Sequence, residues 1–334
     1  MNPVPVPTLE QLEQAFAVTR QVTQATPLLD VPALARDIGA EKVFVKAESL
    51  QVAGSFKFRG AYWRLTRLSD DERARGVIAY SSGNFAQGLA AAGARVGVPI
   101  TIVMPMDAPE VKRRSTEGYG AKVVLSDHGD RPREEAANDL ARTLATERNL
   151  TLLHPFDDPI IVAGQAAAGL EAIEQLESND QCADLVLCSV GGGGLIGGVS
   201  LAFHYFHPDT QVLAAEPVGY DSMGESLRRG ERTRVASGTA TVCDALQATM
   251  PGTAPFAAAR KSGVRGVAVS DDPIKKAMRY AFEKLKLVLE PSGAITLAAI
   301  LDGTVRAEGR RVLIYATGGN AGAVEAFARQ VAVS

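Results

Sequence analysis

One lysine in this chain lies among residues that would make its amine unusually reactive. Lys57 stands between Phe56 and Phe58 in the run Gly54-Ser-Phe-Lys-Phe-Arg-Gly-Ala61. Burial among apolar groups disfavours an ammonium ion and lowers its pKa, which makes lysine usable as a nucleophile or a Schiff-base former. Most lysines are structural, and this run alone also fits a lysine whose stem packs on the aromatic rings at the start of a helix. The rest of the chain has to decide between these readings.

Four consecutive glycines, Gly191–Gly194, follow an apolar run and predict an anion site. Without side chains, successive backbone N–H groups can converge on a phosphate at the N-terminus of the next helix. A simple turn does not need four glycines, so we favour phosphate binding. The spacing Gly192-x-Gly194-x-x-Gly197 also fits a dinucleotide-binding loop, with Glu216 as the acid that would bind a ribose. That alternative is an NAD-dependent dehydrogenase, and it leaves Lys57 without a role.

Two further polar loops follow apolar runs. They are Ser81-Ser-Gly-Asn-Phe85 and Thr317-Gly-Gly-Asn320. A nucleophilic amine, a phosphate site and a partner for a pyridine nitrogen, such as the Thr317 hydroxyl, are the groups that pyridoxal phosphate requires. No Gly-Lys-Ser/Thr sequence occurs, which speaks against nucleoside triphosphate chemistry.

The elements that must position these residues alternate along the chain. Capping and helical spacing predict a helix over 8–20. Further helices are expected from Lys57 to about Leu68 and over 85–95, after Pro109, and over 133–148, 159–176, 273–285 and 292–300. Apolar runs predict strands at 43–47, 77–80, 100–104, 122–125, 150–153, 184–190, 211–215, 266–269 and 311–315. Residues 225–262 show the weakest periodicity and are predicted to be loop with short helices.

This alternation predicts an α/β fold with mostly parallel sheets. The strands are too many for one small sheet, so we expect two lobes with a cleft between them. Ligands of such sheets bind at the carboxyl ends of the strands, where the glycine, serine and threonine loops lie.

Composition excludes several classes of function. The 334 residues have room for about two domains, and 46% apolar with 22% charged residues is ordinary for a globular protein. A net charge of −3 without a long basic run speaks against nucleic-acid binding. Three cysteines without C-x-x-C spacing fit a reducing cytoplasm, and the N-terminus has no signal-peptide pattern. The uncharged span 185–203 contains six glycines, so we read it as strand, loop and short helix, with no membrane span.

The chain resembles the fold-type II pyridoxal-phosphate enzymes, whose fold is like that of the tryptophan synthase β-subunit. It is most similar to the serine/threonine dehydratase and serine racemase branch. The matching segments occur in the family's order and cover nearly the whole chain. They are Gly54–Ala61, Ser81–Asn84, His154–Asp158, Ala163–Gln165, Gly191–Gly194, Glu290–Gly293 and Thr317–Asn320.

The resemblance implies a role for each matched residue. Lys57 would hold the cofactor as a Schiff base and take the Cα proton of the substrate. Residues with cofactor-binding roles would be Phe56, Lys57, Asn84, Gly191, Gly192, Gly193, Gly194, Leu195 and Thr317. Phe56 would pack beside the cofactor ring, Asn84 would bind its 3′-hydroxyl, and Thr317 would meet the pyridine nitrogen. The glycine amides, extended by that of Leu195, would bind the phosphate.

The resemblance also implies a substrate loop and a division into domains. The substrate carboxylate would be held by Ser81, Ser82, Gly83, Asn84 and Phe85. Ser82 matches the serine that acts on the opposite face of the substrate in racemases. A large cofactor-binding domain would comprise residues 1–66 and 155–334. A small α/β domain, residues 67–154, would carry the Ser-Ser-Gly-Asn loop.

The implied reaction is β-elimination of a 3-hydroxy amino acid, such as L-threonine or L-serine, to a 2-keto acid and ammonia. Racemisation of serine or of an aspartate-type substrate, and a 3-hydroxyaspartate ammonia-lyase activity, are alternatives. Relatives usually have histidine at Phe85 and glycine at Ala245, so the substrate pocket differs here. Glu216 and the carbonyl of Tyr220 could bind Mg²⁺ or Ca²⁺, although the family's second acid is replaced by Ser222. We expect a cytoplasmic homodimer.

Overall fold

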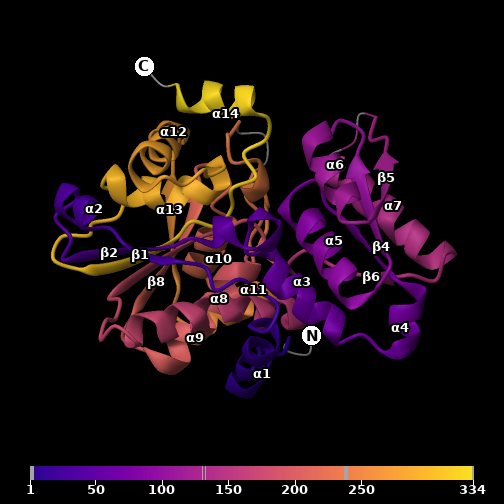
Figure 1. Ribbon diagram of the computed structural model, residues 1–334, viewed down its shortest axis with the longest axis horizontal. Helices are drawn as coiled ribbons and strands as arrows, with labels where there is room; N and C mark the ends of the chain where they lie inside the picture. The colour runs from indigo at the N-terminus through magenta and orange to yellow at the C-terminus, as the bar shows by residue number, and fades with distance from the viewer. Residues whose placement is uncertain (1–3, 130, 132, 237–239, 333–334) are drawn as a thin grey trace.

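Two separate sheets organise the chain. The computed structural model describes residues 4–129, 131, 133–236 and 240–332. A large lobe contains a six-stranded sheet, and a small lobe contains a four-stranded sheet (Figure 1). The strands are β1 (Leu28–Asp30), β2 (Lys42–Lys46), β3 (Val77–Tyr80), β4 (Ile100–Pro105), β5 (Lys122–Ser126), β6 (Thr151–Leu152), β7 (Leu185–Ser189), β8 (Gln211–Pro217), β9 (Arg265–Val269) and β10 (Arg311–Tyr315).

Helices connect these strands and cover both sheets. They are α1 (Leu9–Thr19), α2 (Pro32–Asp37), α3 (Lys57–Thr66), α4 (Asp70–Arg75), α5 (Asn84–Val96), α6 (Glu110–Gly118), α7 (Arg133–Glu147), α8 (Pro159–Glu177), α9 (Gly194–Phe206), α10 (Ser222–Arg229), α11 (Thr253–Lys261), α12 (Asp271–Tyr280), α13 (Pro291–Leu301) and α14 (Val324–Val331).

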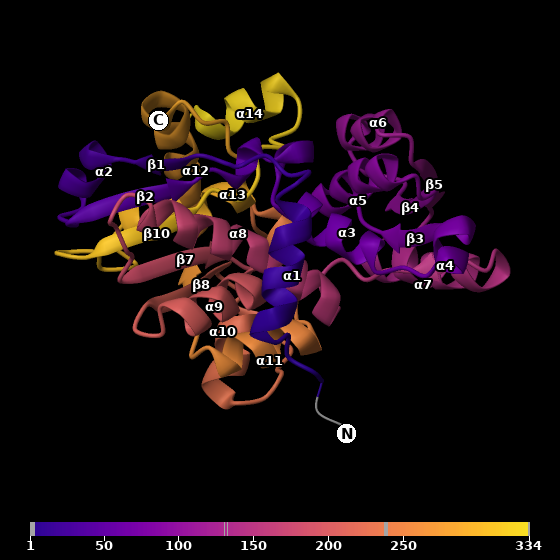
Figure 2. The same cartoon turned by 60° about the horizontal axis from the view of Figure 1, so that its bottom comes forward.

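The large sheet is buried on both faces. Its strand order is β1-β2-β10-β7-β8-β9, and every pairing is parallel except that of β1 with β2. Along β7, Val186 and Cys188 join the core that includes α1, α8, α9 and α11. Leu185 and Leu187 point the other way, into the core with α2, α12 and α13. Helices therefore lie on both sides of the sheet (Figure 2), which explains why β7 is apolar at every position except its last.

The small sheet has the same design on a smaller scale. Its order is β5-β4-β3-β6, and all its pairings are parallel. Val77 and Ala79 of β3 pack with α5, whereas Ile78 packs with α7. The carboxyl ends of the central strands in the two sheets carry the serine, glycine and threonine loops that the sequence singled out.

Helix α3, which begins at Lys57, joins the two lobes and packs on α5 and on α8. Small residues make both contacts close. A Cβ added to Gly60 would lie 2.5 Å from Gln165 Nε2 of α8. A Cβ added to Gly164 of α8 would lie 2.8 Å from the Cα of Gly60. On the other side, a Cβ on Gly88 of α5 would lie 2.9 Å from the backbone nitrogen of Phe58.

A buried ion cluster fixes the first turn of α3 to the large lobe. The Arg59 guanidinium donates to both oxygens of Glu48 at 2.8 and 2.9 Å and to both oxygens of Glu171 at 2.8 and 3.0 Å. Lys46 Nζ lies 2.6 Å from Glu171 Oε1, and the Thr26 hydroxyl donates to Glu48. Arg59 and Glu48 are fully buried.

The structure confirms the predicted α/β fold and most predicted elements. The capping box of Thr8 and Gln11 is present at the start of α1. The span 185–203 divides into β7, the glycine loop and α9, and within the described ranges no helix is long and apolar enough to cross a membrane. The four strands of the small sheet all fall within residues 67–154. The proposed domain limits themselves remain a prediction.

Some elements were missed or misplaced. Strand β1 and the short helices α2, α4 and α14 were not predicted. The region 225–262 contains the nine-residue helix α11, which agrees with the short helices expected there. The helix expected over 273–285 begins at Asp271 as α12 and continues as a π-helical turn over Ala281–Leu285, which Lys286 ends with a φ of 59°.

Candidate active site

Lys57 is placed at the meeting point of the two lobes by backbone pairing. Ser55 and Gly318 form an antiparallel bridge, and the Phe56 N–H donates to the Thr317 carbonyl at 3.3 Å. The segment before Lys57 therefore runs against the loop that follows β10. This pairing brings together the lysine and threonine motifs, which are far apart in the sequence.

The Lys57 side chain is partly accessible, whereas its amine is desolvated. Nζ lies 5.1 Å from the ring centroid of Phe56 and 5.8 Å from that of Phe85, and it donates to the Pro155 carbonyl at 3.4 Å. Burial lowers the pKa of Lys57 to about 8, against a smaller opposing effect from the charge of Glu290. About a tenth of the amine is thus neutral, and nucleophilic, at pH 7.

The glycine loop passes from β7 to α9, as an anion cradle requires. Gly193 has a φ of 98°, which favours glycine. A Cβ on Gly191 would lie 2.9 Å from the Ala245 carbonyl oxygen, and one on Gly192 would lie 2.3 Å from the ring carbons of Phe156. The loop therefore has no room for side chains at Gly191 and Gly192, and its backbone N–H groups lie at the N-terminus of α9.

Thr317 follows β10, and its hydroxyl is buried. Its Oγ1 lies 2.8 Å from Ser189 Oγ at the end of β7 and 3.4 Å from the carbonyl oxygen of Ser292. Sequence reasoning missed Ser189. The available signal was its place as the last residue of a strand that neighbours β10. The pair of hydroxyls offers a neutral hydrogen-bonding partner at the base of the cleft.

Asn84 begins α5 and is buried. Its Nδ2 donates to Glu290 Oε1, and its Oδ1 accepts from Asn320 Nδ2 at 2.8 Å. Sequence reasoning included Glu290 and Asn320 in matched segments but gave neither a role. Their contact with Asn84 joins the ends of three elements.

The rest of the substrate loop lies at the end of β3. Ser81, Ser82 and Gly83 are partly exposed, and the Gly83 N–H donates to Ser81 Oγ at 3.3 Å. Phe85 is buried, and its ring is one of the two that approach the Lys57 amine. The loop therefore has partly exposed hydroxyl and backbone groups next to the buried ring of Phe85.

His154 is a further residue that sequence reasoning gave no role. Its Nδ1 accepts the backbone N–H of Asp157 at 2.8 Å, and its ring meets the Phe156 ring edge-on at 4.5 Å between centroids. Burial lowers the pKa of His154, so the neutral ring that accepts this bond is favoured. The side chain fixes the turn that places the Pro155 carbonyl beside Lys57 and Phe156 against Gly192.

Glu216 is turned into the protein interior. Its two carboxylate oxygens accept the backbone N–H groups of Met223 and Gly224, each at 2.8 Å, and burial raises its pKa to about 8. It thus caps the start of α10. Across the described residues, no group of three or more His, Cys, Asp or Glu side chains has the arrangement of a metal site. The predicted cation site at Glu216 and Tyr220 therefore gains no support, and Glu216 is not free to bind a ribose.

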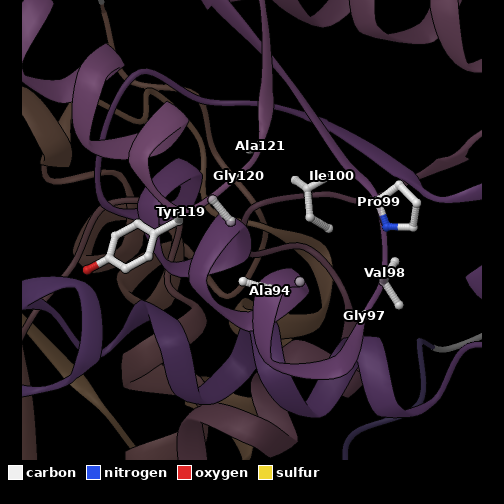
Figure 3. A pocket seen from close by; sticks show the side chains of 10 residues that line it. Ala94, Gly97, Val98, Pro99, Ile100, Tyr119, Gly120 and Ala121 are labelled. Carbon is white, nitrogen blue, oxygen red and sulfur yellow. The ribbon is translucent and has the colours of Figure 1, made fainter.

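A hollow on the small lobe does not belong to this site. It measures about 270 Å³ and lies between α5 and the turns around Gly97 and Gly120, with the Tyr119 ring at one side (Figure 3). Alanine, glycine and other apolar residues form most of its wall, and none of the predicted site residues lines it. Apart from the Tyr119 phenol, it offers no group for acid–base or covalent chemistry.

The residues around Lys57 fit pyridoxal phosphate. The structure provides a desolvated amine, a glycine cradle at a helix N-terminus, a buried hydroxyl pair at Thr317 and a clamped amide at Asn84. They occupy separate strand or helix ends, which come together where the two lobes meet. This donor set suits an aldehyde, a phosphate, a pyridine nitrogen and a ring hydroxyl.

Comparison with known proteins agrees with this fit. Residues 19–318 match the family model described as pyridoxal-phosphate dependent enzyme. An L-threonine ammonia-lyase of Thermotoga maritima is 38% identical over 313 residues, which cover 94% of this chain and 75% of that protein.

Solved structures agree as well. A threonine deaminase from T.th. has a TM-score of 0.86 and 37% identity, with 94% of this chain and 98% of that chain covered. Maize serine racemase has a TM-score of 0.88 and 31% identity, with 95% and 94% covered. The extent of the family match and the level of identity leave no place for the dehydrogenase alternative. The chain belongs to the family of pyridoxal-phosphate-dependent enzymes.

Proposed function

We propose that this enzyme eliminates the β-hydroxyl group of a 3-hydroxy amino acid, such as L-threonine or L-serine, as water. The enamine so formed takes up one water again and releases ammonia, so the net products are a 2-keto acid and ammonia. The observation that carries the proposal is the Lys57 amine, whose pKa burial lowers to about 8 and which lies between the lobes beside the substrate loop. The similarity to a threonine ammonia-lyase and a threonine deaminase supports the choice of reaction and substrate.

Each residue of the site has a defined task in this proposal. Lys57 anchors the cofactor and accepts the Cα proton, because its neutral amine is accessible near neutral pH. The Gly191–Gly194 amides, with that of Leu195, bind the phosphate, and Phe56 packs beside the ring. Thr317 meets the pyridine nitrogen, and Asn84 meets the ring hydroxyl. When bound, pyridoxal phosphate withdraws electrons from the substrate Cα and makes its proton acidic.

The substrate itself is held by the loop at the end of β3. Residues Ser81–Phe85 bind the carboxylate through backbone and hydroxyl groups, which orients the Cα–H bond toward Lys57. Phe85 and Ala245, which replace the histidine and glycine usual in relatives, shape the pocket for the β-substituent. An aromatic ring at position 85 favours a substrate with an uncharged side chain.

A substrate panel tests the proposal. Purified enzyme is incubated with serine, threonine, 3-hydroxyaspartate and phenylserine, and keto-acid and ammonia release are measured. We expect release from L-threonine or L-serine in equal amounts of the two products. A protein without a visible cofactor band, or one that releases keto acid from none of the four, would contradict the proposal.

Racemisation is the second candidate, and the similarity to maize serine racemase favours it. Ser82 lies partly exposed in the substrate loop, where its hydroxyl could protonate Cα from the face opposite Lys57. Chiral analysis of recovered serine or aspartate distinguishes the two reactions. Substituting Ser82 by alanine should remove racemisation and leave elimination.

The capture of cofactor should depend on pH through Lys57. Only the neutral amine attacks an aldehyde, so the covalent capture rate falls as pH drops below the Lys57 pKa of about 8. Between pH 6.5 and 7.5 the neutral fraction, and with it the rate, should rise roughly tenfold. Growth of the visible band after mixing cofactor-free protein with pyridoxal phosphate measures the rate. A rate independent of pH over this interval would show that the amine is already neutral.

Substituting Gly192 by alanine should weaken cofactor binding selectively. The new Cβ would meet the Phe156 ring, so the loop and its N–H groups must shift away from the phosphate. We expect the dissociation constant of the cofactor to rise about tenfold to a hundredfold, measured by equilibrium titration. Gly118→Ala, at the exposed end of α6, is a control with open space around it and without a positive φ. Equal affinity in Gly192→Ala would argue against phosphate binding here.

We further propose a cytoplasmic homodimer. The three cysteines are free, as expected in a reducing compartment. Light scattering of the purified enzyme measures the assembly state. A divalent cation is not part of the proposed chemistry, since both oxygens of Glu216 are already engaged by backbone N–H groups.

A further inference from the structure

Glu290 carries a buried carboxyl group that forms no direct ion pair with any residue in the described ranges. It precedes α13 and is 3% exposed. Within the described part of the chain, no lysine, arginine or histidine lies within ion-pair distance of it. Burial raises its pKa to about 7, with a further contribution from the charge of Asp244, whereas the charges of Lys112 and Lys57 and the hydrogen bond from Asn84 act in the opposite direction. Buried carboxyl groups of this kind are costly and are retained where they serve a site.

The Glu290 carboxyl group contacts the amide of Asn84. Asn84 Nδ2 donates to Glu290 Oε1, while Asn84 Oδ1 accepts from Asn320 Nδ2. Asn320 Nδ2 is in turn held by the carbonyl of Ala53 at 2.9 Å. The two ends of the Asn84 amide thus have different partners, one acceptor and one donor.

These partners select one orientation of the amide. An ionised carboxylate only accepts hydrogen bonds, so a flipped amide would turn Asn84 Oδ1 against Glu290 and Nδ2 against Asn320. Nδ2 carries two hydrogens, and Glu290 takes one of them. In the described ranges no second acceptor for Nδ2 is found, so one N–H is free for a ligand.

The backbone is shaped to allow this contact. A Cβ on Gly318 would lie 2.1 Å from Glu290 Oε1 and 3.1 Å from Asn84 Nδ2. The Glu290 N–H donates to the Gly318 carbonyl at 3.1 Å. The loop that carries Thr317 therefore closes directly over the contact between Glu290 and Asn84.

We propose that Glu290 is a positioning residue which, together with Asn320, fixes the Asn84 amide so that one N–H faces the ring hydroxyl of the cofactor. This inference rests on the proposed role of Asn84. It extends that role, because it attributes the orientation of the Asn84 amide to the Glu290 carboxyl group, for which the sequence motifs predicted no function.

A consequence is that the cofactor should sense the protonation of Glu290. The ionised carboxylate accepts the Asn84 N–H more strongly than the neutral acid does. In the cofactor-free protein, its charge also stabilises the ammonium form of Lys57. The visible absorption of the cofactor depends on the protonation of the groups around its ring, so the band should change as Glu290 titrates near neutral pH.

The test is a pH titration of the visible band of the holoenzyme from pH 6 to 9. We expect a spectral transition near pH 7 in the parent enzyme, and its loss or displacement by about one pH unit or more in Glu290→Gln. Asp302→Asn, which changes an exposed carboxylate at the opposite end of α13, should titrate like the parent. Asn320→Ala keeps Glu290, so the transition near pH 7 should persist while the band maximum shifts.

The outcomes separate this inference from the proposed function. An unchanged titration in Glu290→Gln overturns the positioning role, even where keto-acid formation is intact. If Glu290→Gln does not fold, an Asn320→Ala band identical to that of the parent overturns it instead. If the parent enzyme shows no visible cofactor band, both the proposed function and this inference are wrong.

Discussion

Replacing Lys57 by alanine is expected to lower the turnover number at least about a thousandfold and to remove the visible cofactor band. The substitution deletes both the covalent anchor and the base, and a positioned base alone contributes about a hundredfold to ten-thousandfold. Absorption spectra of the purified variant and initial rates of keto-acid release measure the two effects. The neighbouring ring of Phe85 and the Pro155 carbonyl cannot substitute for the amine.

A second variant separates the amine from its charge. Lys57→Arg keeps a cation in the same place but cannot become a neutral nucleophile at accessible pH. It should be as inactive as Lys57→Ala. Activity in the arginine variant within about tenfold of the parent would mean that Lys57 acts through its charge alone.

Replacing Arg59 by methionine is expected to reduce the free energy of unfolding by about 3–5 kcal/mol. The Arg59 guanidinium binds both carboxylates of the buried cluster, so its removal leaves Glu48 without its ionic partner and Glu171 with only Lys46. Methionine fills much of the volume, so the loss arises mainly from uncompensated charge. Urea unfolding followed by circular dichroism measures the change.

An exposed ion pair serves as the matched control. Arg20 binds Glu174 at 3.2 Å, and both side chains are about half exposed. Arg20→Met should therefore change stability by less than about 1 kcal/mol. Equal effects of the two arginine substitutions would show that burial of the Arg59 cluster does not determine its contribution.

The features that the sequence predicted well are local ones. Uninterrupted apolar runs identified the central strands, since a strand covered on both faces needs no polar alternation. The four glycines indicated a closely packed loop after β7, and Gly191 and Gly192 indeed have no room for a side chain; phosphate binding there stays a prediction. Lys57 was recognisable by its two aromatic neighbours in the sequence, Phe56 and Phe58. Of the rings that lie near its amine, one is Phe56 and the other is Phe85, which is distant in the sequence.

What escaped prediction depends on contacts between distant segments. Asn84 and Glu290 are 206 positions apart, and Ser189 and Thr317 are 128 apart, so neither pair has a local pattern. Strand β1 has only three residues, too few for a periodic signal. The dinucleotide site suggested by the glycine spacing was wrong for a related reason. The orientation of the Glu216 carboxylate depends on its hydrogen bonds to the first turn of α10, which the local sequence around Glu216 does not reveal.

The backbone contacts of α3 also determine how the enzyme can bend. Gly60 lets α3 approach α8 closely on one side, and Gly88 of α5 lets that helix approach α3 closely on the other. Because α3 packs closely on both α5 and α8, it holds the two lobes together beside Lys57 and leaves little room for one lobe to slide past the other. The substrate loop is tied to the large lobe as well, because Asn84 is hydrogen-bonded to Glu290 and Asn320. The contacts of α3 and of Asn84 therefore favour a site that is already assembled before a substrate arrives.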